Sequence, residues 1–319
     1  MKMSELQKSV SIVTPAFNEI ECIGELLRRL EALAEKEKEY QFEVIVIENG
    51  SSDGTWEYLQ NFDTKSFKKV FVQLSRNFRM DGGLTAGLDF ATGDATVLMS
   101  SDLQDPPEFI STFLRKWEEF YENIFGVVTK RSGTSLIRRI NSRLFYKIAN
   151  RLSDGVLPEN ASDFRLLDRK VYEALRGMRE RNRFLRGLVA WSGFRSIGMP
   201  LVRPERYAGK SKAYSFQVLD LAIKGILAHS MVPLRMVSIF GMGLSLLSIV
   251  SFFPMLILWI FVGVPFAGFG TLVTLILFLF SAGIFMMGIL SEYIGLIYQE
   301  AKERPNYIVS QVIRSTSDS

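Results

Sequence analysis

The sequence is poor in the residues that hold transition metals. Its 319 residues include one cysteine, Cys22, and one histidine, His229. One cysteine cannot form a disulfide within the chain, and such small numbers exclude a cysteine-based or multi-histidine metal site. Any bound metal must therefore be a hard cation held by oxygen ligands. The formal net charge of +4 is too small to indicate a nucleic-acid partner.

Charge is absent from one long stretch. Residues 237–291 contain no Asp, Glu, Lys, Arg or His. A single helix of this length would measure about 80 Å, whereas the hydrocarbon core of a bilayer is roughly 30 Å thick. We therefore expect a hairpin of two membrane spans, at about 237–262 and 271–290, because the residues between them include three glycines and one proline. A buried core hairpin of a large soluble protein is the alternative.

The flanks of this stretch predict its orientation. Arg235 precedes it, and Lys302 and Arg304 follow it, so the positive-inside tendency places both termini in the cytoplasm. The polar first eight residues contain no signal peptide. We expect a protein of the inner (cytoplasmic) membrane. The predicted parts are a soluble domain over 1–213, an interfacial amphipathic helix and connector over 214–234, the hairpin over 235–298, and a cytoplasmic tail over 299–319.

Acidic residues are absent from a second stretch, residues 123–153, which holds seven basic residues. Four of them, Arg139, Arg143, Lys147 and Arg151, recur every four positions beside an apolar stripe. This pattern is typical of a basic amphipathic helix on an anionic leaflet, although a helix that packs on the sheet would show it too. Residues 215–228 form a second candidate interfacial helix, with His229 just beyond it as an interfacial side chain.

The remaining sequence alternates between strand and helix patterns. Short β-rich apolar runs occur at 10–14, 42–47, 70–74, 95–99 and 125–129. Helical patterns cover 20–39, 80–90 and 106–121. This alternation predicts an α/β fold with a mostly parallel sheet and helices on both faces. In such sheets ligands bind beyond the carboxyl ends of the strands.

Three polar loops follow strands of this predicted sheet. They cover residues 14–19, 48–55 and 100–108, and each contains a carboxylate. Any one of them could be an ordinary turn, because Asn, Asp, Ser and Gly are common turn and capping residues. Asp105, for example, is interpreted as an N-cap before Pro106, with a direct active-site role as the alternative. Three such loops at strand ends, in this order, favour a binding site at one edge of the sheet.

At these loops the sequence resembles the family-2 inverting glycosyltransferases with a GT-A fold. The resemblance continues through 74–78, 87–94, 102–108, 162–166, 180–184 and 206–212. Together with the hairpin, it extends over nearly the whole chain and is similar to the polyisoprenyl-phosphate glycosyltransferases. These include bactoprenol glucosyltransferases and, more distantly, dolichyl-phosphate mannose synthases.

The resemblance implies roles for particular residues. The residues expected around the nucleotide sugar are Pro15, Phe17, Glu19, Asn49, Asp53, Ser100 and Gln104. Asp102 and Gln104 are expected at the metal, Asp102 and Asp163 in catalysis, and Arg131, Arg165, Arg206 and Lys212 at the phosphates. Two positions depart from the family pattern, because Ser100 and Asn49 stand where the family usually has Asp. Both can form hydrogen bonds, but neither carries charge.

Asp163 keeps several possible roles at this point. It can bind metal, orient the acceptor or hold Arg165, and without a functional role it would be an N-cap or the ion-pair partner of Arg165. The sequence does not decide between them.

The implied reaction moves one sugar, with glucose as the best guess, from a UDP-sugar to undecaprenyl phosphate on the cytoplasmic leaflet. It proceeds with inversion and with Mg²⁺ or Mn²⁺, and serves cell-envelope glycan modification. A phosphate monoester has a second pKa of about 6, so it is largely a dianion at pH 7 and already a nucleophile, and the shortage of histidine is no obstacle. The bacterial members of the family suggest a homo-oligomer, with a tetramer as one form.

Three alternatives remain at this point. A GDP-mannose-dependent synthase would share the site. A processive polysaccharide synthase would need more than two spans and a Gln-x-x-Arg-Trp motif that is absent here. A non-catalytic membrane scaffold is suggested by Ser100 and Asn49.

Overall fold

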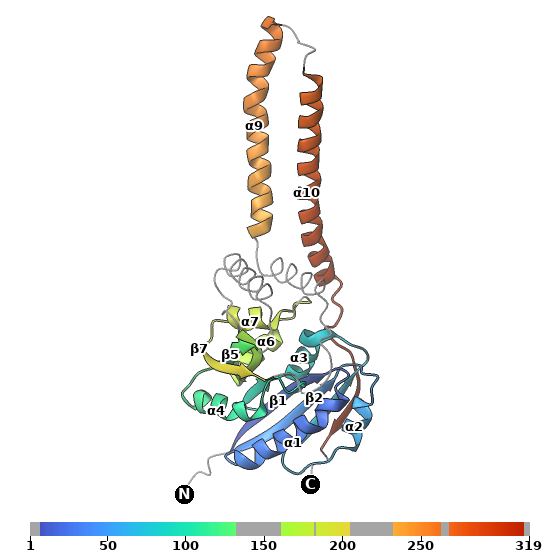
Figure 1. The fold of residues 1–319 in the computed structure, drawn as a ribbon, viewed down its shortest axis with the longest axis vertical. Coiled ribbons are helices and arrows are strands. Elements are labelled where there is room, and N and C mark those ends of the chain that lie inside the picture. Colours follow the sequence, from blue (N-terminus) through green and yellow to red (C-terminus); the bar gives the residue numbers. More distant parts are fainter. Residues whose placement is uncertain (1–6, 132–160, 182, 205–231, 263–267, 316–319) are drawn as a thin grey trace. The chain divides into compact units, whose positions relative to one another are not determined.

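A computed structural model describes residues 7–131, 161–181, 183–204, 232–262 and 268–315 (Figure 1). The chain divides into two compact units. The first contains Met1–Tyr214 together with Arg304–Ser319, and the second contains Ser215–Glu303. The predicted basic helix that carries Arg139, Arg143, Lys147 and Arg151, and the predicted interfacial helix at 215–228 with His229, lie outside the described residues.

The first unit is built on an eight-stranded sheet in the order β7-β5-β6-β4-β1-β2-β3-β8. Strands β4, β1, β2 and β3 run parallel, whereas β6 is antiparallel to both β4 and β5. The predicted α/β architecture is confirmed. The strands cover β1 (Lys8–Ala16), β2 (Tyr40–Glu48), β3 (Lys68–Leu74), β4 (Ala95–Leu98), β5 (Asn123–Arg131), β6 (Ala161–Asp168), β7 (Ser196–Arg203) and β8 (Val309–Arg314).

Helices cover both faces of this sheet. Neighbouring residues of a strand point to opposite sides, and in the central strands both sets of side chains are apolar and have to be buried. Ile12 and Val44 belong to one apolar core, and Val13 and Ile45 belong to the other. The first core takes in α1 (Ile20–Lys36), α2 (Thr55–Asn61), the 3-10 turn η1 (Pro107–Phe109) and α4 (Ile110–Glu118). The second takes in α3 (Arg79–Phe90), α6 (Arg169–Gly177) and α7 (Leu185–Trp191).

Helix α3 packs unusually close to β1. A Cβ atom added at Gly87 would lie 2.1 Å from Val13 Cγ1, and one added at Gly83 would lie 2.8 Å from Pro15 Cβ. The two glycines are one helical turn apart and therefore face the strand together. This close approach brings the first turn of α3 to the edge where β1 ends.

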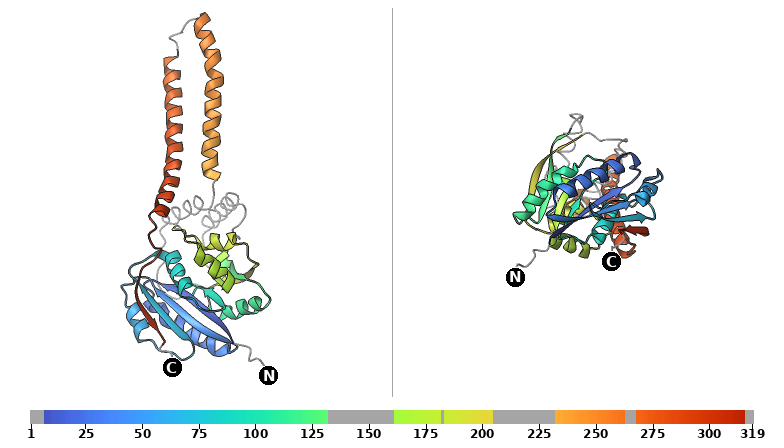
Figure 2. Two further views of the ribbon diagram at one scale, coloured as in Figure 1. Left: turned by 180° about the vertical axis from the view of Figure 1, so that it is seen from behind. Right: turned by 90° about the horizontal axis from the view of Figure 1, so that it is seen from below.

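Strand β8 completes the sheet at the free side of β3, as seen from behind in Figure 2. It is antiparallel to β3, with Gln311 opposite Gln73 and Arg314 opposite Val70. The prediction of a plain tail over 299–319 is wrong for residues 309–314, which form this strand. An edge strand buries little side-chain surface, and most of β8 is exposed, so its sequence lacks a continuous apolar run.

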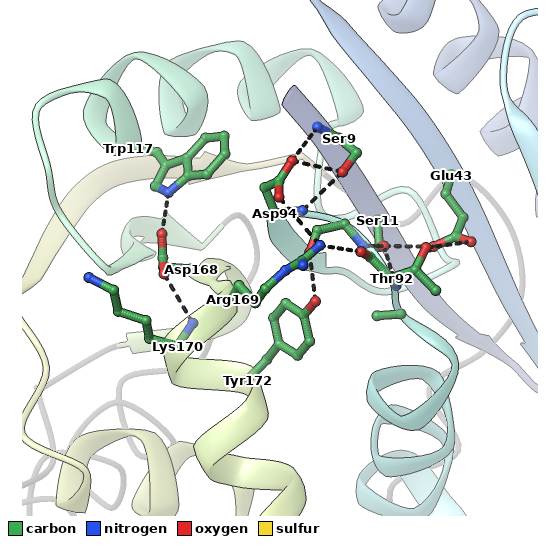
Figure 3. A network of polar contacts seen from close by, with 12 residues as sticks. Ser9, Ser11, Glu43, Thr92, Asp94, Trp117, Asp168, Arg169, Lys170 and Tyr172 are labelled. Carbon is green, nitrogen blue, oxygen red and sulfur yellow. Dashed lines mark hydrogen bonds and ion pairs between the residues drawn. The ribbon is translucent and has the colours of Figure 1, made fainter. Parts of the chain in front are cut away.

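A network of polar contacts stabilises the edge of the sheet where β1 and β4 begin (Figure 3). Asp94 accepts hydrogen bonds from the backbone N–H and the hydroxyl of Ser9, both at 2.9 Å. Burial raises the pKa of Asp94, but these hydrogen bonds and the charge of Arg169 hold it below its usual value. Tyr172 donates to the Gly93 carbonyl at 2.6 Å. The network fixes the turn between α3 and β4.

The second unit consists of two long apolar helices among its described residues, α9 (Val232–Val262) and α10 (Phe269–Ala301). They run side by side (Figures 1 and 2). Within the described residues, Phe278–Ala301 is the one segment long and apolar enough to meet a strict criterion for crossing a membrane. The two-span hairpin therefore remains a prediction.

Candidate active site

The candidate site lies where the parallel strands end. In the sheet, β2 and β3 lie on one side of β1, whereas β4 lies on the other side. Such a reversal of strand order opens a crevice between the two following loops, and ligands of α/β sheets bind there. The Ser101 hydroxyl donates to the Pro15 carbonyl at 3.0 Å and joins the loop after β4 to the end of β1. Pro15 itself is buried.

The loops after β1 and β2 are fastened to each other through Asp53. One carboxylate oxygen of Asp53 accepts from the Ile20 N–H at 3.1 Å, and the other accepts from the N–H and hydroxyl of Thr55. Burial raises the pKa of Asp53, and these hydrogen bonds more than offset it and hold the pKa below its usual value. Asp53 thus shapes the loop on which the half-buried Phe17 and Glu19 lie.

Asn49 ties the loop after β2 to the loop after β3. Its buried side chain accepts from the Phe78 N–H at 2.8 Å and donates to the Arg79 carbonyl at 2.9 Å. The partners fix the orientation of the amide, because a backbone N–H can only donate and a carbonyl can only accept. A carboxylate cannot donate to the Arg79 carbonyl. The departure from Asp at this position therefore has a structural reason.

Replacing Asn49 by Asp is expected to destabilise the protein by about 1–3 kcal/mol, because a buried carboxylate would face the Arg79 carbonyl without a proton. Thermal unfolding of the detergent-solubilised protein measures the effect. Asn61→Asp is the matched control, since exposed Asn61 donates to the Glu57 carbonyl, and its effect should stay within about 0.5 kcal/mol. Equal melting temperatures for Asn49→Asp and the wild type would contradict the prediction.

The loop after β4 gathers oxygen atoms. The Ser100 hydroxyl lies 2.8 Å from Asp102 Oδ1 and 2.7 Å from Asp105 Oδ2. Asp102 Oδ1 also accepts from the Gln104 N–H at 3.2 Å. Leu103 is buried with a φ of 60°, a left-handed conformation that branched side chains rarely adopt. The hydrogen bonds around it hold the loop in this strained shape.

The interpretation of Asp105 as an N-cap is wrong. The 3-10 turn that follows has no side-chain cap. Asp105 is instead 1% exposed and accepts from the Ser100 N–H at 3.0 Å and from Arg203 Nη2 at 2.7 Å. The local sequence Asp-Pro-Pro suggested a cap, whereas the actual partner comes from β7, far along the chain.

Strand β6 brings Asp163 to the same edge, because β6 is antiparallel to β4 and its first residues lie where β4 ends. Asp163 pairs with Arg186 at 2.9 Å. Arg165 is buried and donates to the Ser162 carbonyl at 2.8 Å. Burial lowers the pKa of Arg165 to about 10, although the charge of Asp163 partly offsets it. Arg165 is therefore held in the interior beside Asp163, and its predicted contact with an acceptor phosphate stays a prediction.

The other predicted phosphate-binding residues are only partly described. Arg131 is the last residue of β5 and lies opposite Arg203 of β7 at this edge. Arg206 and Lys212 lie outside the described residues.

Asp81 is an acidic residue near Asp163 that the sequence does not single out. It lies in the first turn of α3 and accepts from the Leu185 N–H at 3.3 Å. Burial, with a smaller contribution from the charge of Asp163, raises the pKa of Asp81 to about 6, although Arg186 and Arg183 act in the opposite direction. An acidic residue in a first helical turn is common, because it interacts favourably with the helix dipole, so the sequence held no signal that Asp81 lies near Asp163.

Replacing Asp81 by Asn should stabilise the protein at pH 7 by about 1–3 kcal/mol, because the buried charge is removed. The folded pKa lies above the unfolded one, so wild-type stability falls as the pH rises from about 4 through 6. The advantage of the variant should therefore shrink as the pH is lowered across this range. Melting temperatures between pH 4 and 8 test this, with exposed Asp63→Asn as control. A pH-independent difference would contradict it.

Comparison with known proteins identifies the family. Residues 11–176, which span β1 to α6, match the sequence profile described as Glycosyl transferase family 2. The chain belongs to this family. It is therefore a glycosyltransferase with the GT-A fold, and its crevice between β1 and β4 is the candidate active site.

Curated relatives resemble the chain over nearly its whole length. "Uncharacterized glycosyltransferase YkcC" of Bacillus subtilis is 36% identical over 94% of this chain and 93% of its own. "Bactoprenol glucosyl transferase" of Shigella phage SfV is 35% identical over 94% and 97%, and the Escherichia coli K12 "Prophage bactoprenol glucosyl transferase homolog" is 34% identical over 95% and 99%. A glucosyl-3-phosphoglycerate synthase from Mycobacterium tuberculosis, solved with Mn²⁺ and UDP-glucose, is a distant structural neighbour, with 17% identity over 69% of this chain and 78% of that chain and a TM-score of 0.45.

Proposed function

We propose that the protein transfers one sugar, with glucose as the first candidate, from a UDP-sugar to undecaprenyl phosphate. The observation that carries this proposal is the extent of the similarity to bactoprenol glucosyl transferases, which includes 94% of the chain and hence both the sheet and the apolar helices. A lipid acceptor explains why a sheet with a nucleotide-type crevice is joined to helices such as α9 and α10.

The nucleotide is proposed to lie against the loops after β1 and β2, which carry Pro15, Phe17 and Glu19 on one side and Asn49 and Asp53 on the other. The two loops are held together by Asn18, whose amide oxygen accepts from the Ser52 N–H at 2.8 Å. A rigid pair of loops can select a flat base between them, because the cost of ordering the site is already met in the fold.

Asp102 and Gln104 are proposed to hold Mg²⁺ or Mn²⁺, with Ser100 beside the donor diphosphate. The donor set fits such a cation, because a carboxylate and an amide oxygen are hard ligands. Among the described residues no three Asp, Glu, His or Cys side chains form a metal cluster. The remaining ligands would be diphosphate oxygens and water, as is usual for Mg²⁺ at phosphate sites. When bound, the cation would neutralise charge that develops on the leaving diphosphate.

The acceptor phosphate is proposed to attack the sugar directly and invert its anomeric centre. A phosphate monoester is largely a dianion at pH 7, so the chain need not supply a strong base. Its contribution is to position the two substrates and to balance their charge. Asp163 and Arg186 stand at the acceptor side of this proposal, and Arg131, Arg206 and Lys212 are the proposed phosphate contacts.

A donor panel tests the proposed function. Purified full-length protein is incubated with undecaprenyl phosphate, Mg²⁺ or Mn²⁺, and UDP-glucose, other UDP-hexoses or GDP-mannose in turn. A glycolipid from UDP-glucose that disappears with EDTA is the expected result. A product from GDP-mannose alone would replace the proposed donor, and no product with any donor would overturn the proposal.

The membrane arrangement is part of the same proposal. We place α9 and α10 as two spans with both termini in the cytoplasm, and the protein as a homo-oligomer in the inner membrane. Single cysteines introduced near residue 265 and near residue 302 should react with a membrane-impermeant maleimide from opposite sides. The native Cys22 is buried, so it should add little background labelling. Labelling of both from one side would contradict this topology.

A further inference from the structure

One cationic side chain touches both halves of the candidate site. Arg203, the last residue of β7, donates from Nε at 3.1 Å and from Nη2 at 2.7 Å to Asp105 Oδ1. The same Nη2 atom lies 3.0 Å from the Ser162 hydroxyl oxygen. Asp105 belongs to the loop that carries Asp102, and Ser162 directly precedes Asp163 in β6. Arg203 therefore joins the two segments whose carboxylates are proposed to act in the reaction.

Asp105 is fully engaged by these contacts. Its Oδ1 receives two hydrogen bonds from Arg203, and its Oδ2 receives the N–H and faces the hydroxyl of Ser100. This carboxylate is 1% exposed and both of its oxygens already accept hydrogen bonds, so it is not available to contact a substrate. Asp105 can act only on its neighbours. Its neighbour in the loop is Ser100, two residues before Asp102.

Ser100 is shared between two carboxylates. Its hydroxyl has one proton, yet the oxygen lies within 2.8 Å of both Asp102 Oδ1 and Asp105 Oδ2. The hydroxyl can donate to only one of them at a time. Arg203 supplies positive charge to Asp105 and so determines how strongly Asp105 competes with Asp102 for this proton. A chain of contacts thus runs from Arg203 through Asp105 and Ser100 to the proposed metal ligand.

We propose that Arg203 and Asp105 are positioning residues that hold Asp102 in place through Ser100 and tie its loop to the strand of Asp163. This inference rests on the proposed function, since it takes Asp102 as a metal ligand. It also gives a reason for a serine where the family usually has Asp. Asp105 and Asp102 need a proton donor between them, and a second carboxylate at position 100 would supply none at neutral pH.

The experiment measures Mn²⁺ binding to the full-length protein in detergent with UDP present, by the loss of the free Mn²⁺ signal in electron paramagnetic resonance. Asp105→Asn puts an amide group, which cannot accept a hydrogen bond through its nitrogen, opposite Ser100 or Arg203. We expect it to weaken Mn²⁺ binding by about 10- to 100-fold, the usual effect of losing a group that orients a metal ligand. Arg203→Lys keeps the charge but loses the paired contact, and should fall between this variant and the wild type.

A matched control separates positioning from stability. Glu37 is likewise a buried carboxylate, 6% exposed, and pairs with Arg115 at 2.5 Å, but it follows α1 at the opposite edge of the sheet. Glu37→Gln should lower the melting temperature about as much as Asp105→Asn and leave Mn²⁺ affinity unchanged. The double variant Ser100→Ala/Asp105→Asn should bind Mn²⁺ no more weakly than the weaker single variant, because both changes break one chain of contacts.

The outcomes separate the two proposals. If the wild type binds Mn²⁺ with UDP and Asp105→Asn binds it equally well, the positioning inference is overturned and the proposed function stands. Effects of Ser100→Ala and Asp105→Asn that multiply in the double variant overturn it as well. If the wild type itself binds no Mn²⁺ with UDP, the proposed metal site is overturned and the inference with it.

Discussion

Replacing Asp102 by Asn is expected to lower kcat/KM for sugar transfer by roughly 10²–10³-fold, or about 3–4 kcal/mol of transition-state stabilisation. The substitution keeps the shape of the side chain, and its Oδ1 can still accept from Ser100 and the Gln104 N–H. What is lost is the charge that would bind a divalent cation. Initial rates of glycolipid formation at several donor concentrations measure the effect, and higher Mn²⁺ should restore part of the activity.

Asp94→Asn is the control for this variant. Asp94 is a hydrogen-bonded carboxylate of the same sheet, but it lies in the network at the other edge (Figure 3). Its replacement should cost about 1–2 kcal/mol of stability and leave kcat/KM within a factor of about two. An Asp102→Asn protein that is as active as Asp94→Asn would contradict the assignment of Asp102.

Replacing Asp163 by Asn is expected to lower kcat by roughly 10²-fold and also to lower the melting temperature. Asp163 neutralises Arg186 and stands beside the buried Arg165, so the substitution leaves two cations without their carboxylate. The two effects need to be separated, because a loss of stability alone can reduce activity. Assays well below the melting temperature, together with thermal unfolding, provide both measurements.

The double variant Asp163→Asn/Arg186→Gln makes this separation. Removing Arg186 as well takes away the unpaired charge, so the melting temperature should recover in part. The activity should not recover, if Asp163 faces the substrates as proposed. Full recovery of activity in the double variant would show that Asp163 serves only to balance Arg186.

Much of the fold was predictable because the central strands are buried on both faces. Such strands appear in the sequence as continuous apolar runs, and the predicted 10–14, 42–47 and 70–74 all lie inside β1, β2 and β3. Helix α2 was missed because its seven residues are too few to show a helical period. Strand β7 was missed because it lies at the edge of the sheet, where half of its residues are exposed and only Leu201 is buried.

The site was predictable only where function depends on local sequence. The loops of Asn49 and Asp102 follow recognisable strands, so their place at one edge followed from the rule for parallel sheets. The contacts of Asp105, Asp81 and Asp163 come from residues distant in the chain, such as Arg203 for Asp105. A single sequence carries no signal for such pairs, since any of its many arginines can be the partner.

The position of β8 bears on how the protein is made. The last strand of the sheet, β8, is synthesised after both apolar helices. Until residue 314 has left the ribosome, the edge of β3 that pairs with β8 has no hydrogen-bonding partner strand. Open strand edges invite pairing with other chains. A chain that ends at residue 213 should therefore aggregate, whereas the same fragment with residues 304–319 fused through a short linker should stay monodisperse in gel filtration. With α9 and α10 as the proposed membrane spans, their insertion would precede completion of the sheet.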